Sequence, residues 1–306
     1  MDAAAVGREY VAHLTDADLT LLASAAGAPG PGVTSGAVPI LPADADAAWL
    51  RGNPAAIPDL LGDPRVFEAV FGWGDSSGQP RPGQAVPVSP FLTFAVAVHR
   101  SATELSSMGH VAERTGPRQR VPLFDAPALR EFLGSPARKL FLAELLASFT
   151  RVTSGRYRVR GGGRTRRFSE LDPVRLAGLL DGVPDAERPG VYRRLGDVSL
   201  FLAGVFPDHA TLYGAGPVAV ARLLRAAHVP AAEYERLSTV PAIELLEQLG
   251  ARWYRAAYGL APVRTARLDV VADVAGRFQQ ARRVLNHVAD RYLFATDHPW
   301  LAPPTP

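Results

Sequence analysis

Apolar residues recur at helical spacing along most of the chain, and the pattern is clearest over residues 267–294. It forms one stripe of nine residues: Leu268, Val271, Val274, Ala275, Phe278, Ala281, Leu285, Val288 and Tyr292. This stripe predicts one long helix. Asp273 and Arg277, four residues apart and off the stripe, are expected to pair at the surface, and His287, opposite the stripe, is expected in solvent.

Helix start signals precede several other apolar runs. Ser89-Pro90, Ser135-Pro136 and Asp172-Pro173 each place a capping side chain before a proline, which lacks the amide hydrogen that would go unpaired there. Thr15, followed by Asp18 three residues later, predicts a capping box for a helix over 15–26. Periodicity predicts further helices over these ranges: 191–206, 217–227 and 241–258.

Proline and glycine divide the chain near residues 73–89, the clearest linker in the sequence. We therefore predict a loop-rich N-terminal region with short helices over 1–88 and a helical domain over 89–306. The predicted fold class is mainly α: an irregular multi-helix bundle with one small arginine-rich β-hairpin at about 156–168.

That hairpin is predicted from two short arms around the triple glycine 161–163, which permits a tight turn. A three-residue loop would pair Arg158 with Arg166 and place five arginines on one face: Arg156, Arg158, Arg160, Arg164 and Arg166. Residues 151–167 contain seven arginines and no acid, so the rest of the chain is net negative. The face is interpreted either as an anion-binding ribbon or as an exposed basic loop of an arginine-rich protein.

Ionisable residues also occur inside helices that are apolar nearly all round. They form a candidate buried polar cluster: His99, Arg100, Glu104, Glu144, Arg193 and Asp197. If they converge, they could line a pocket for a ligand, a metal or acid–base chemistry. The simpler interpretation, which we favour, is a set of structural ion pairs, because a buried carboxylate requires a partner.

Composition excludes several kinds of chemistry. The absence of cysteine excludes disulfides, thiolate metal sites and a cysteine nucleophile. No histidine or carboxylate pattern has metal-site spacing, and no P-loop or nucleophile elbow is present, so we predict neither a metal nor a cofactor and lean against an enzyme. No apolar run is long enough to span a membrane and no signal peptide is evident, so we expect a cytoplasmic protein.

The basic residues are almost all arginine, with Lys139 as the sole lysine, as is typical of a GC-rich genome. The segment over residues 168–208 resembles part of a family of uncharacterised actinobacterial proteins: FSELDPVRLAGLLDGVPDAERPGVYRRLGDVSLFLAGVFPD. Two earlier segments, SPFLTFAVAVHR and KLFLAELLASF, extend the resemblance over about residues 89–210. The resemblance implies no activity and assigns no site residue.

Three functional hypotheses follow from these patterns. The first is a binding or regulatory protein that engages an anionic partner, whether nucleic acid, phosphorylated ligand or acidic protein, through the arginine hairpin. The second is an enzyme or ligand-binding protein that uses the buried polar cluster. The third is a helical scaffold that forms oligomers through the stripe of 267–294.

Overall fold

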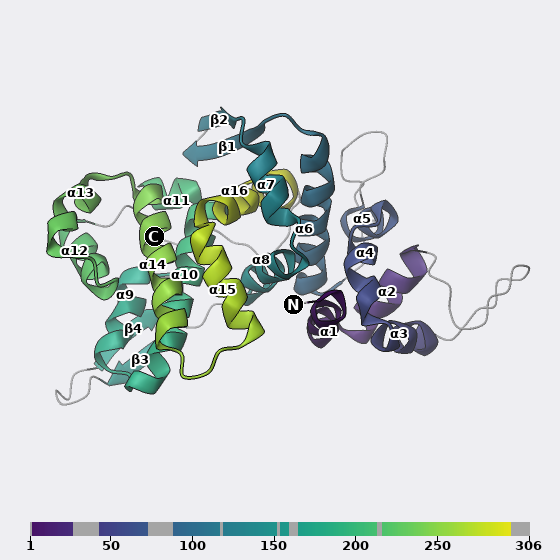
Figure 1. Ribbon diagram of the computed structural model, residues 1–306, viewed down its shortest axis with the longest axis horizontal. Helices are drawn as coiled ribbons and strands as arrows, with labels where there is room; N and C mark the ends of the chain where they lie inside the picture. The colour runs from purple at the N-terminus through teal and green to yellow at the C-terminus, as the bar shows by residue number, and fades with distance from the viewer. Residues whose placement is uncertain are drawn as a thin grey trace, which may run out of the picture. The chain divides into compact units, whose positions relative to one another are not determined.

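The computed structural model describes residues 2–26, 43–72, 88–116, 119–151, 154–158, 165–212 and 216–294 (Figure 1). The mainly helical prediction is confirmed. The chain forms two compact units, and each is built from two segments: unit 1 from 1–109 and 133–147, unit 2 from 110–132 and 148–306. The boundary predicted at residues 88 and 89 therefore falls inside unit 1.

Unit 1 is a group of helices around an apolar core. Its helices are α1 (Ala3–His13), α2 (Asp16–Ala26), α3 (Ala43–Gly52), α4 (Ile57–Leu61), α5 (Pro64–Phe71), α6 (Pro90–Ser107) and α8 (Pro136–Ser148). The first half of α6 is buried on all sides, which accounts for its nearly continuous apolar sequence.

The predicted helix starts in unit 1 are confirmed in detail. The Thr15 backbone amide and hydroxyl donate to Asp18 at 2.9 and 2.7 Å, and the Asp18 amide donates back to the Thr15 hydroxyl. The second Asp18 oxygen accepts from the Ser89 amide at 2.9 Å, while the Ser89 hydroxyl caps α6 through Leu92. This fully buried carboxylate thus joins the starts of α2 and α6.

Unit 2 is organised around α10 (Arg188–Val205), which packs against α14 (Ala242–Leu260) and α16 (Phe278–Val288). A Cβ atom at Gly196 of α10 would lie 2.3 Å from the Tyr254 ring, so only glycine permits this approach. The remaining helices of unit 2 are α7 (Ala126–Leu133), α9 (Pro173–Ala177), α11 (Pro207–Leu212), α12 (Pro217–Ala226), α13 (Tyr234–Thr239) and α15 (Ala266–Gly276).

The prediction of one helix over 267–294 is wrong, because the chain turns at Arg277 between α15 and α16 and continues after α16 as a π-helix, Ala289–Leu293. The turn follows Gly276, a poor helix former, and brings the Phe278 ring 5.7 Å from that of Tyr254. Tertiary packing here overrides a continuous helical pattern.

Of the two side-chain predictions made for this segment, one is confirmed and one is wrong. The Asp273–Arg277 pair is confirmed at 2.5 Å. The expectation that His287 is solvated is wrong: its side chain is buried, because α16 is covered by α10, α14 and β1 (Val111–Gly116). The apolar stripe is also buried, apart from the half-buried Leu268, so it forms part of the core of unit 2.

The arginine hairpin is confirmed as strands β3 (Ser154–Arg158) and β4 (Thr165–Ser169), but the predicted register is wrong by one residue. Arg166 lies opposite Tyr157, not opposite Arg158 as predicted. Arg158 lies opposite Thr165. Positions 156, 158 and 167 therefore share one side of the ladder, and position 166 is on the other. Arg160 and Arg164 lie outside the described residues.

A second hairpin, not predicted from the sequence, pairs β1 with β2 (Gln119–Leu123). The Asn286 side chain of α16 accepts from the Arg114 amide at 2.8 Å and donates to the Arg114 carbonyl at 3.0 Å. Asn286 thus attaches β1 to α16 in the way that a neighbouring strand would. Within the described ranges, no helix is both long and apolar enough to cross a membrane.

Candidate functional site

The six residues of the predicted polar cluster are divided between the units. His99, Arg100, Glu104 and Glu144 belong to unit 1, whereas Arg193 and Asp197 belong to unit 2. Arg100 pairs with Glu104 at 3.2 Å on the same helix. The Asp197 carboxylate accepts from the Tyr254 hydroxyl at 2.9 Å, and Arg193 lies 4.0 Å away.

His99 and Glu144 do occur in one neighbourhood, around Tyr10 of α1. The Tyr10 hydroxyl and the Nε2 of His99 are 3.0 Å apart, and the His99 ring also bonds the backbone of Pro58. Because Pro58 has no amide hydrogen, its carbonyl must accept from the ring, which leaves Nε2 to accept from Tyr10. Burial, together with the charge of Lys139, holds the pKa of His99 well below its usual range.

The Glu144 side chain bonds His13 at 2.8 Å, and its charge adds to the effect of burial in raising the pKa of Tyr10. In the part of the chain that the structure describes, no group of three His, Asp or Glu side chains could hold a metal ion. The arrangement is that of structural hydrogen bonds and ion pairs.

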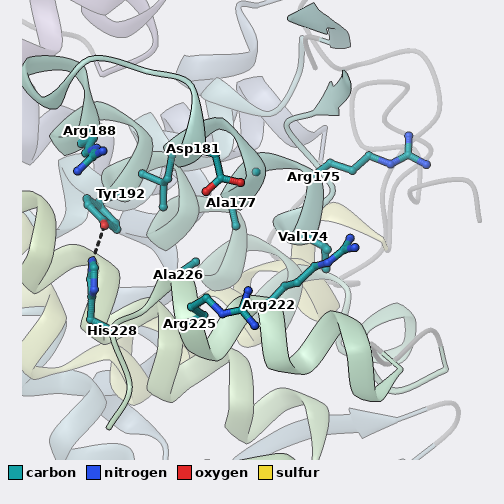
Figure 2. Close-up of a pocket in the computed structure, with 12 residues that line it drawn as sticks. Val174, Arg175, Ala177, Asp181, Arg188, Tyr192, Arg222, Arg225, Ala226 and His228 are labelled. Atoms are coloured by element: carbon teal, nitrogen blue, oxygen red, sulfur yellow. Dashed lines mark hydrogen bonds between the residues drawn. The ribbon is translucent and has the colours of Figure 1, made fainter. Parts of the chain in front are cut away.

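A cavity of about 870 Å³ lies in unit 2, between α9, the start of α10 and α12 (Figure 2). Its rim carries four arginines: Arg175 from α9, Arg188 from α10, and Arg222 and Arg225 from α12. Asp181 is the sole acid among the described residues that line it. We call this the basic cavity. It was not predicted from the sequence.

The four arginines differ in their partners. Arg175 is paired with Asp172 and Arg188 with Asp185, both at 3.0 Å. The exposed side chains of Arg222 and Arg225 form no salt bridge or hydrogen bond with any described residue. Figure 2 shows these two side chains together on α12, while Arg175 extends away from the other labelled residues.

Tyr192 and His228 also line the basic cavity. The Tyr192 hydroxyl and the Nε2 of His228 are hydrogen-bonded at 2.8 Å (Figure 2). Burial raises the pKa of Tyr192, and the charge of Arg188 opposes that effect. The Tyr192 hydroxyl and the His228 ring therefore give the lining hydrogen-bonding groups besides its arginines.

The predicted hairpin lies near the basic cavity in the fold, because β4 packs against α9. The dense arginines of the hairpin predicted it, whereas the lining of the cavity comes from three separate segments and was not predicted. A weak signal was present: Arg222 and Arg225 are three residues apart on a short helix that contains no acid.

A second cavity of unit 2, about 750 Å³, is lined by β1, α14 and α16. Its arginine, unlike Arg222 and Arg225, is paired with acids. Arg282, buried at 3 % exposure, is paired with Glu113 and with Glu247. Glu113 also contacts Arg283 at 3.3 Å, and Arg283 bonds Asp125 at 2.7 Å. These side chains compensate one another and join β1 to α14 and α16.

Comparison with known proteins does not assign either cavity. No family model matches the chain, and no similar curated protein or similar solved structure was found. The resemblance to uncharacterised actinobacterial proteins therefore stays a prediction, and function is inferred from the geometry of the basic cavity.

Proposed function

We propose that unit 2 is a binding module for a phosphorylated ligand, which it receives in the basic cavity. The observation that carries this proposal is the pair Arg222 and Arg225, which lies at a cavity without a carboxylate partner among the described residues. Two like charges held three residues apart repel each other, and an anion between them relieves that repulsion. Guanidinium groups bind phosphate oxygens in a bidentate way.

The size of the cavity supports a small ligand. Its volume of about 870 Å³ lies within the range of small-molecule sites. The charge around it supports an anion: among the described residues, the lining has four arginines and one aspartate. Anions are therefore attracted to this part of unit 2.

The test is calorimetric titration with pyrophosphate at several salt concentrations. Replacing Arg222 and Arg225 with serine is expected to weaken binding by at least about tenfold and to reduce its salt dependence. The matched control replaces Arg8 and Arg65, two exposed arginines of unit 1, with serine, which changes the net charge equally. Equal affinities in the two double variants would contradict the proposal.

Nucleic acid is the second candidate, favoured specifically by the hairpin arginines. Serine at Arg158, Arg160, Arg164 and Arg166 should then weaken DNA or RNA binding and lower its salt dependence, measured by fluorescence anisotropy. If this variant keeps the wild-type salt dependence, the hairpin is not a nucleic-acid surface. The scaffold hypothesis is not carried further, because the stripe on which it depended is buried within unit 2.

A further inference from the structure

His228 occupies an unusual backbone position at the end of α12. It has a φ of 50°, the sole positive value at a non-glycine residue in the part of the chain described. Its amide bonds the Arg225 carbonyl, and the Val229 amide bonds the Leu224 carbonyl, so it closes the helix where glycine is the usual residue. A side chain is disfavoured in this conformation, although histidine tolerates it better than most residues.

The histidine side chain gives a reason for its presence there. It lines the basic cavity, and its Nε2 is held by the Tyr192 hydroxyl at 2.8 Å. The bond holds the ring against Tyr192 at the end of α12, as Figure 2 shows. Glycine would close the helix without strain but would leave the cavity lining without this imidazole.

The chemistry of the lining groups other than arginine indicates the non-phosphate part of the ligand. An imidazole and a phenol donate and accept hydrogen bonds, and the Asp181 carboxylate accepts several at once. These groups complement hydroxyls, which also donate and accept. Tyr192 is the sole Phe, Tyr or Trp of the described lining and is 3 % exposed, so it offers no ring face on which a nucleobase could stack.

We propose that the basic cavity selects a sugar phosphate, with its phosphate at Arg222 and Arg225 and its hydroxyls read by the His228–Tyr192 pair and Asp181. The inference rests on the proposed function, since it needs the cationic pair to bind the phosphate. His228 is the specificity-determining residue. Its side chain stands at a helix end that glycine would close more readily.

The experiment compares ribose 5-phosphate with inorganic phosphate by calorimetric titration of the full chain. The wild type is expected to bind the sugar phosphate about tenfold more tightly, as two additional hydrogen bonds would give. His228→Gly and His228→Asn, which both suit the left-handed backbone, should abolish most of this preference. His228→Gly should change the melting temperature little, because relief of backbone strain offsets the lost bond to Tyr192.

The outcomes separate the two proposals. A wild type that binds both ligands equally, or histidine variants that keep the tenfold preference, would overturn this inference while leaving the cationic pair in place. If neither ligand binds, or if Arg222→Ser with Arg225→Ser leaves both affinities unchanged, the proposed function itself fails. A preference that persists in His228→Gly and disappears in Asp181→Asn would assign selection to Asp181 instead.

Discussion

Two groups of arginines in unit 2 have the same chemistry and opposite surroundings. Arg282 and Arg283 are held by Glu113, Glu247 and Asp125. Arg222 and Arg225 line a cavity, exposed, with no carboxylate partner among the described residues. The first group is expected to stabilise the fold and the second to bind. The difference shows that the role of an arginine is set by the acids around it.

The largest expected effect is at Arg282. Arg282→Met leaves the buried carboxylates of Glu113 and Glu247 without their main partner and should lower the free energy of unfolding by about 3–5 kcal/mol, measured by urea denaturation. Adding Glu113→Gln and Glu247→Gln should recover much of that loss. Arg252→Met, at a half-exposed pair with Glu233, is the control and should cost about 1 kcal/mol or less. Similar losses of unfolding free energy in Arg282→Met and Arg252→Met would contradict the expected difference between a buried and a half-exposed ion pair.

His99 tests burial of a base that has no opposite charge. Because its pKa is well below its usual range in the folded state, the unfolded state binds the additional proton as pH falls below about 6.5. Stability is therefore present above that pH and decreases below it, by about 1.4 kcal/mol per pH unit. Urea unfolding between pH 7 and 5 should show this slope in the wild type. The slope should be shallower in His99→Gln, and parallel profiles would refute the assignment.

Arg194 is intermediate between the buried Arg282 and the exposed cavity arginines, because it is partly buried, stacked on an aromatic ring and paired with an acid. Its guanidinium lies 3.9 Å from the Phe149 ring centre and 3.2 Å from Glu170. Arg194→Lys keeps the charge but loses the planar stack, and it should cost about 1 kcal/mol in thermal or urea unfolding. The exposed Arg264, stacked 3.7 Å over Tyr258, is the matched position. Its lysine variant should cost about half as much, and an equal cost would mean that burial does not matter here.

The smallest expected effect on stability is at the cavity. Arg222→Ser and Arg225→Ser, singly or together, should change the free energy of unfolding by less than about 0.5 kcal/mol, because no described partner is lost. A stabilisation by the double variant would fit the repulsion between the two guanidiniums. A loss approaching that of Arg282→Met would show that these arginines are structural after all.

Local signals predicted local structure well in this chain. The Thr15–Asp18 box and the caps at Ser89 and Asp172 were predictable, because each depends on a few neighbouring residues. The hairpin arms were also predictable, but the register depends on the turn, and one residue of slip exchanges the faces. The break at Arg277 follows from packing against distant residues, and apolar periodicity does not report it.

The candidate site could not be predicted in the same way. His99 and Glu144 were found because a charge in an apolar helix is visible in one segment, but their real partners, Tyr10 and His13, lie about ninety and one hundred and thirty residues away. The basic cavity needs three segments to meet. His228 gave no signal at all, because a left-handed backbone is visible only in the folded chain.

The interleaving of the two units has a consequence for how the protein is made. During synthesis, unit 1 lacks α8 until residue 147 has left the ribosome, and β1 with Glu113 emerges well before the Arg282 that compensates it. A truncation at any single point therefore removes part of a unit: a fragment starting at residue 148 would lose the β1–β2 hairpin. Segments that are synthesised early complete their unit only after later segments have emerged. Premature termination is therefore expected to leave incomplete units exposed to proteases.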